Sequence, residues 1–250
     1  MTTPWSVPAM WKGGECYIIG GGSSLLKNFS VPVELGRAVQ QGKEHPSALS
    51  QYLAPIHDKH VIGINSAFLL GPWQDVIFFG DSSWYDKNKY ALATFPAIKV
   101  TCCPDSTPDR FQDAEIKWVT RDRSQKGRKH QGLSDDPTSV IWNYHSGGAA
   151  INLAYHFGAK KIYLIGFDMQ ADENGHTHWH GEYRRKSAPV PPRKREKGTG
   201  KVPKAPFNRH LRVYEQLAVD ARVRGLQIVN LSPTTAIKAF PHEVPSWQKT

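Results

Sequence analysis

The segment CYIIGGGSSLLK, which runs from Cys16 to Lys27, indicates the fold more clearly than any other part of this 250-residue chain. Residues 16–19 are apolar and predict a buried strand, and Leu25 and Leu26 begin a helical segment. Between them lies a run that can fold into a tight turn: Gly20, Gly21, Gly22, Ser23 and Ser24. The order is therefore strand, glycine turn and helix start.

Two interpretations of this glycine turn are open. Backbone N–H groups at the start of a helix suit a phosphate, so the turn is predicted to bind phosphate or ribose. The alternative is a plain tight turn without a ligand. A dinucleotide fingerprint fits less well, because Leu25 stands where the third glycine is expected and the next strand ends at Asn65 rather than at an acid.

Further apolar runs predict a sheet of several strands. The expected strands are residues 60–64, 75–79, 97–102, 116–119, 161–166 and 227–230. The expected helices are residues 33–41, 82–93, 146–157, 209–224 and 233–239. This alternation predicts one α/β domain over residues 1–250, a Rossmann-like open and mostly parallel sheet with helices on both faces. Ligands of such sheets lie at the carboxyl ends of the strands, where the glycine turn, Asn65, Asp81 and Asp168 are found.

Two polar segments interrupt the pattern. Residues 121–137 are expected to form a mobile loop, and residues 169–206, with five prolines between 189 and 206, a long inserted lid. The net charge is +10, and residues 184–204 supply +8 of it through nine Lys or Arg and one Glu. That stretch favours anionic partners, namely nucleotide phosphates, nucleic acid or an acidic glycan, unless it is a plain solvated loop.

The remaining composition points to a reducing compartment. The three cysteines form neither a disulfide framework nor a metal-spaced set. No apolar run approaches 18 residues, so no membrane span is expected and the protein is predicted to be cytoplasmic. The oligomeric state is left open.

A cluster of histidines lies inside the predicted lid. His176, His178 and His180 alternate, so an extended backbone places them on one face. His178 or His180 is a candidate general base. Arg184, Arg185 and Trp179 are candidates for contacts with the substrate. The alternatives are a polar loop rich in histidine, or a metal site, although no Cys partner, His-Glu-x-x-His motif or Asp-x-Asp pair accompanies it.

Aromatic residues near the strand ends add candidates for stacking. Trp142 and Tyr144 precede Ser146, and Trp84 and Tyr85 follow Asp81. Each could stack on a base or a sugar, or simply pack at the rim. His145 is a lesser candidate for the site.

Several blocks together resemble a known group of proteins. They are IIGGGSSLL at 18–26, GIN at 63–65, SGG at 146–148 with its helix, KIYLIGFD at 161–168 and VNLSP at 229–233. In order and spacing they resemble the bacterial lipo-oligosaccharide sialyltransferases. A related superfamily, often phage-encoded, includes the archaeal hydroxymethyl-dihydropterin pyrophosphokinases. The resemblance spans roughly residues 15–170 and 206–240.

The resemblance implies a Rossmann-like glycosyltransferase that uses a nucleotide-activated donor, CMP-sialic acid in the sialyltransferases. It implies no metal and a histidine base that follows a mobile lid. Its nucleotide and sugar contacts would map onto Gly20, Gly22, Ser23, Ser24, Asn65, Ser146 and Gly147. If the chain is phage-encoded, it would act in the host cytoplasm.

Two departures from that pattern leave choices open. Asp81 replaces an Asn, and a carboxylate beside a phosphate is repulsive unless it is protonated, paired or metal-bound, so Asp81 is also a candidate for the acceptor side. The base maps either to the His178 and His180 cluster or to His210, which follows the basic stretch.

Three functions follow. The first is metal-independent transfer of a sugar from a nucleotide sugar, which is a co-substrate rather than a cofactor, to a glycan or a modified DNA base. The second is a pyrophosphokinase or nucleotidyl-type transferase in which Asp81 and Asp168 bind Mg²⁺. The third is a nucleic-acid-binding protein without activity.

Overall fold

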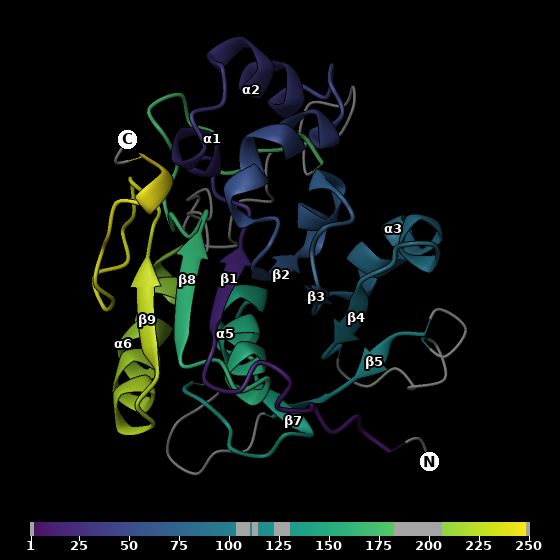
Figure 1. Cartoon of the computed structure of the whole chain (residues 1–250), viewed down its shortest axis with the longest axis vertical. Coiled ribbons are helices and arrows are strands. Elements are labelled where there is room, and N and C mark those ends of the chain that lie inside the picture. The colour runs from purple at the N-terminus through teal and green to yellow at the C-terminus, as the bar shows by residue number, and fades with distance from the viewer. Residues whose placement is uncertain (1–2, 104–110, 112–114, 123–130, 183–206, 249–250) are drawn as a thin grey trace, which may run out of the picture.

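The computed structural model describes residues 3–103, 111, 115–122, 131–182 and 207–248 (Figure 1). Its centre is a seven-stranded sheet in the order β5-β4-β3-β2-β1-β8-β9, and every neighbouring pair is parallel. The strands are β1 (Glu15–Ile19), β2 (His60–Ile64), β3 (Val76–Phe79), β4 (Ile98–Thr101), β5 (Lys117–Trp118), β8 (Lys161–Ile165) and β9 (Gln227–Asn230). The predicted Rossmann-like fold class is confirmed.

Side chains of each strand alternate between two cores. Cys16 and Ile18 face the core that α5 (Ser146–His156) and α6 (Phe207–Val223) cover. Tyr17 and Ile19 face the opposite core, under α1 (Leu25–Asn28), α2 (Val33–Gln40) and the 3₁₀ segment η1 (Pro46–Ile56). A third cluster joins β3 to η2 (Asn65–Leu70) and α3 (Ser82–Ala93). The helices therefore cover both faces, as expected.

Two sequence predictions are wrong, the second of them only in part. Residues 233–239 form no helix. There the Ala236 N–H donates to the Asp168 carbonyl, and the Thr235 hydroxyl donates to the Phe167 carbonyl, so tertiary contacts take up the groups that a helix would use. Only the first two residues of the predicted loop 121–137 differ, because they belong to β6 (Thr120–Asp122), which pairs in parallel with β7 (Ser139–Ile141) in a second sheet. Residues 123–130 of that loop lie outside the described residues. A short 3₁₀ turn, η3 (Ser246–Gln248), was not predicted.

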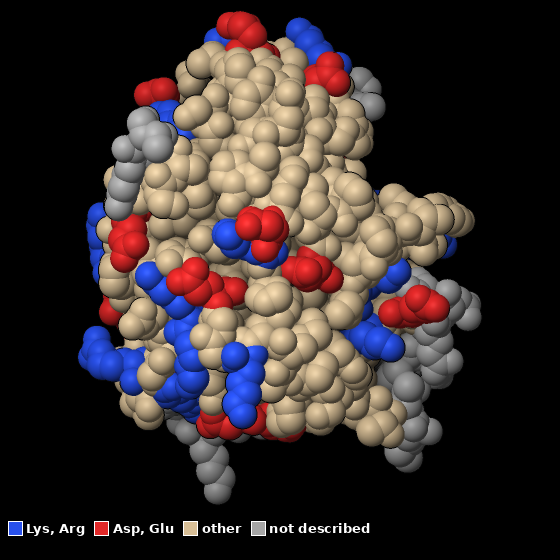
Figure 2. Space-filling model, viewed as in Figure 1, with Lys and Arg blue, Asp and Glu red and all other residues tan. Residues whose placement is uncertain are grey.

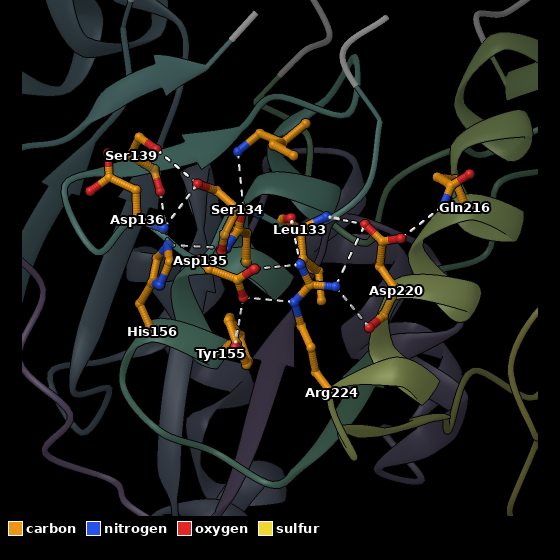
Figure 3. Close-up of polar contacts among 12 residues, drawn as sticks. Leu133, Ser134, Asp135, Asp136, Ser139, Tyr155, His156, Gln216, Asp220 and Arg224 are labelled. Carbon is orange, nitrogen blue, oxygen red and sulfur yellow. Dashed lines mark hydrogen bonds and ion pairs between the residues drawn. The ribbon is translucent and has the colours of Figure 1, made fainter. Parts of the chain in front are cut away.

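A polar network holds the segment before β7 against α5 and α6 (Figure 3). The Asp220 carboxylate accepts the Leu133 N–H at 2.9 Å, and Arg224 pairs with Asp135 at 2.6 Å. The Asn152 side chain accepts the Ser134 N–H at 2.9 Å and the Ile141 N–H at 3.0 Å. These contacts fix the start of β7 and hence the turn that follows it.

The order in which strands are added to the sheet reverses between β1 and β8. From β1 the chain builds β2 to β5 on one side, then returns to place β8 and β9 on the other. The loops after β1 and β8 touch at this switch point. The Gly20 N–H donates to the Ile165 carbonyl and the Gly22 N–H donates to the Gly166 carbonyl, both at 2.8 Å. A crevice for ligands is expected outside this point.

Charged side chains are mixed on the face shown in Figure 2, where Lys and Arg gather mainly toward the lower left and acidic residues lie among them. Among the described residues, no helix combines the length and apolarity needed to cross a membrane.

We expect the substitution Gly22→Ala to destabilise the protein by about 2 kcal/mol, because the new methyl group has no room. A Cβ at this position would lie 2.6 Å from the Gly166 carbonyl oxygen and 2.6 Å from Asp168 Cγ. Gly36→Ala is the control, since its Cβ would meet only the flexible end of Leu26 and alanine favours the helix. Urea denaturation measures both, and equal stability of the two variants would contradict the close packing.

Candidate active site

A cavity of about 840 Å³ lies at the carboxyl edge of the sheet. The glycine turn, the ends of β2, β3 and β8, the turn after β7, the start of α5 and the start of α6 all contribute to it. Its predicted members are Gly20, Gly21, Gly22, Asn65, Asp81, Ser146, Gly147, Asp168, His178, His180 and His210. The structure therefore brings together residues that are up to 190 positions apart in the sequence.

Trp179 holds the glycine turn in place through two hydrogen bonds to its backbone. The Trp179 ring is fully buried, its Nε1–H donates to the Gly20 carbonyl at 2.9 Å, and its backbone N–H donates to the Gly21 carbonyl at 3.0 Å. The prediction that Trp179 contacts the substrate is corrected, because its ring has no exposed surface. The Gly21 N–H has no acceptor among the described residues, which leaves it available to a ligand.

Ser23 and Ser24 do not line this cavity. They border a separate, smaller pocket of about 220 Å³ on the other side of the turn. The Ser24 N–H donates to Asp168 at 2.9 Å, and the Ser24 hydroxyl donates to the other oxygen of the same carboxylate. Burial raises the pKa of Asp168. Both oxygens of this carboxylate thus hold the glycine turn to the loop after β8.

Asn65, at the end of β2, has two unusual features. Its backbone φ is 51°, in the left-handed region that costs energy for a residue with a side chain. Its Oδ1 is buried and has no hydrogen-bond partner among the described residues. A buried acceptor without a partner is uncommon in folded proteins.

The N-terminus of α5 forms another wall. His145 caps this helix: its Nδ1 accepts the Gly148 N–H at 3.2 Å. The N–H groups of Ser146 and Gly147 have no acceptor among the described residues, as expected for the first turn of a helix. Burial, then His210, then Arg209 lower the pKa of His145 to about 3, so its ring is neutral.

Hydrogen bonds attach the segment 176–182 to the rim of the cavity. Besides the two Trp179 bonds, the Gln40 side chain donates to the His178 carbonyl at 3.2 Å. His176, His178 and His180 all line the cavity, as their alternation predicted. Burial lowers the pKa of His178 to about 4, and burial together with His178 lowers that of His180 to about 3.

His210 reaches the same cavity from α6. Its ring lies 4.8 Å from the ring of His145, measured between centroids, and it is only partly buried. Burial and then the neighbouring Arg209 lower its pKa. Of the predicted bases, His210 is therefore less desolvated than His180.

The end of the cavity farthest from β8 carries Asp81, Trp142 and Tyr144. Asp81 rather than Ser82 caps α3, because its Oδ1 accepts the Ser83 N–H at 2.8 Å. The Arg121 guanidinium lies 3.7 Å above the Trp142 ring.

Sequence reasoning missed some of the lining residues. Gln40, Met169, Thr177 and Phe207 lie in the wall, and no motif marks them. Arg184 and Arg185 lie outside the described residues, so their predicted contacts stay predictions. The described residues gather no three His, Cys, Asp or Glu side chains that could hold a metal.

Removing the His180 imidazole should flatten the pH dependence of stability. The folded-state pKa of about 3 is below the ordinary 6.5, so His180 destabilises the fold progressively as pH falls below 6.5 and has no such effect above it. We expect His180→Gln to reduce the slope of the free energy of unfolding between pH 6.5 and 4 by up to ~1.4 kcal/mol per pH unit. Urea titrations at several pH values measure it, and an unchanged slope would contradict a neutral, buried His180.

Comparison with known proteins finds no matching family model and no matching curated protein. Among solved structures, the MAf glycosyltransferase from Magnetospirillum magneticum AMB-1 aligns with a TM-score of 0.53 and 12% identity over 100% of this chain. This chain spans 35% of the length of that protein. The sialyltransferase CstII from Campylobacter jejuni aligns at 14% identity over 92% of this chain, with TM-scores of 0.43 in complex with CMP and 0.48 with CMP-3FNeuAc. These alignments cover 85% and 86% of the two CstII chains. The likeness to MAf shows that this chain shares the fold of a glycosyltransferase.

Proposed function

We propose that this chain is a glycosyltransferase that takes a sugar from a nucleotide-activated donor without a metal ion and uses His210 as general base. The observation that carries the proposal is a cavity at the switch point between β1 and β8 whose lining includes backbone N–H groups without an acceptor among the described residues.

The switch point supports the placing of the donor. Gly21 lines one side of the cavity and Ser146 and Gly147 line another, and none of their N–H groups has an acceptor in the part of the chain that the structure describes. Backbone N–H groups of this kind can stabilise the negative charge of a phosphate even where no Lys or Arg side chain contacts it. The donor phosphate would bind between the glycine turn and the start of α5, and Asn65 would contact the nucleoside.

His210 is the favoured base for two reasons. It is less buried than His178 and His180, whose pKa values of about 4 and about 3 make them weak proton acceptors near neutral pH. It also faces the start of α5 through its contact with His145. His178 and His180 then serve to shape the wall.

The reaction is a direct displacement. His210 takes the proton from an acceptor hydroxyl, and the acceptor oxygen forms a bond to the anomeric carbon of the donor sugar. The bond from that carbon to the phosphate oxygen breaks, and the electron pair leaves with the nucleotide. The N–H groups of Gly21, Ser146 and Gly147 stabilise the charge that develops on the phosphate. The acceptor is a glycan or a modified DNA base.

We expect a nucleotide sugar to raise the melting temperature of the protein without added metal, since a ligand that binds only the native state stabilises it. A screen of CMP, UDP, GDP and ADP sugars and ATP, each with and without Mg²⁺, measures this. A shift with ATP that requires Mg²⁺ would instead favour a pyrophosphokinase that uses Asp81 and Asp168. No shift with any nucleotide, together with salt-sensitive DNA binding, would favour a binding protein.

Replacing the proposed base should remove transfer but not binding. We expect His210→Gln to lower the turnover of the identified donor by about 100-fold or more, while the thermal shift caused by that donor persists. His178→Gln and His180→Gln should lose less activity. His242→Gln removes an exposed imidazole outside the cavity and is the matched control. A larger loss of activity in His180→Gln than in His210→Gln would reassign the base.

A further inference from the structure

The β3 end of the cavity differs in chemistry from the switch point. At the switch point the unpaired groups are N–H donors, which suit an anion. At the β3 end the exposed Asp81 carboxylate lines the wall, and its Oδ2 has no partner among the described residues. β3 is two strands from β1, or about 10 Å at the usual strand spacing. The two ends are therefore separate binding regions of one cavity.

Trp142 lies beside the end of β3 that carries Asp81, and Tyr144, two residues further along the chain, lines the same cavity with the Arg209 guanidinium 5.7 Å from its ring centre. The backbone of Gly80 lies close to the edge of the Trp142 ring, because a Cβ on Gly80 would be 2.3 Å from Cζ3 and 2.6 Å from Cη2 of that ring. Arg121 covers the ring from 3.7 Å, and its guanidinium also donates to the Gly80 carbonyl and, at 2.8 Å, to the Cys102 carbonyl. Two of the five Arg121 N–H donors are thus bonded to backbone carbonyls, which holds the guanidinium over the Trp142 ring.

The backbone that presents this wall is strained. Asn143 and Tyr144 have φ values of 51° and 59°, which is unfavourable for two consecutive residues with side chains. The buried Asn143 amide maintains this turn by bonding the Gly132 N–H at 2.8 Å, the Gly132 carbonyl at 3.0 Å and the Ile141 carbonyl at 3.1 Å. Strain that surrounding contacts enforce at a cavity wall is typical of binding sites.

We propose that Asp81, Trp142 and Tyr144 form the subsite for the acceptor, and that the acceptor is an uncharged saccharide rather than DNA. A sugar offers hydroxyl donors to a carboxylate and apolar C–H faces to aromatic rings. A phosphodiester would instead meet the negative charge of the exposed Asp81 carboxylate, although the Arg209 guanidinium lies 5.7 Å from the centre of the Tyr144 ring. This inference rests on the proposed transferase, whose donor occupies the other end of the cavity.

The test uses the full chain and neutral oligosaccharides as probes, with single-stranded and duplex DNA alongside, and measures binding by saturation-transfer NMR. We expect saccharide binding that weakens about tenfold in Asp81→Asn and in Asp81→Ser. Both residues still cap α3, so the helix is retained. Asp58→Asn, an exposed carboxylate outside the cavity, is the control and should bind as wild type does. Trp142→Leu should also lose saccharide binding, and its melting temperature checks its folding.

The same preparations are screened with nucleotide sugars by thermal shift, which separates the two proposals. Nucleotide binding that persists in Asp81→Asn, together with Asp81-dependent saccharide binding, supports the subsite. Nucleotide binding without any saccharide binding, or saccharide binding that Asp81→Asn and Trp142→Leu leave unchanged, overturns the subsite but not the transferase. Saccharide binding without nucleotide binding keeps the subsite and removes the transferase. DNA binding that Asp81→Asn strengthens would show that the acceptor is a nucleic acid.

Discussion

The contact between the loops after β1 and β8 is the constraint on which the rest of the site depends. The two loops approach so closely that a side chain at Gly20 or Gly22 would collide with the Gly166 carbonyl. Trp179 closes the arrangement by donating to the carbonyls of Gly20 and Gly21. The glycines therefore serve packing as well as any ligand, and their spacing by itself does not distinguish the two uses.

Burial divides the titratable groups of the cavity into two kinds. His145, His178 and His180 are so desolvated that they stay neutral at physiological pH and act as shaped, uncharged walls. His210 is more exposed and comes from a helix that begins after the undescribed part of the chain. A general base must accept a proton near neutral pH, and the more exposed His210 can do so more readily than the desolvated rings of His145, His178 and His180.

The two ends of the cavity carry complementary chemistry. Unpaired N–H groups gather near the point where β1 and β8 diverge, and an exposed carboxylate with two aromatic rings lies at the β3 end. An anionic donor would bind beside the N–H groups, and a neutral acceptor would bind beside the carboxylate and the aromatic rings. The reacting atoms would then meet between the two ends of the cavity. This polarity is a consequence of topology, because each strand end contributes a different residue to one edge of the sheet.

The sequence by itself determined the α/β class, the strands around the glycine turn and the residues at the strand ends, because apolar periodicity and glycine placement are local signals. It did not determine that β6 pairs with β7 or that residues 233–239 form no helix, because both depend on contacts with other segments of the chain. The sequence also could not show that the Trp179 ring is fully buried while Trp142 lines the cavity, because both tryptophans lie near polar segments. Only the tertiary structure decided which side of each loop faces the cavity, because that depends on how the loops pack against one another.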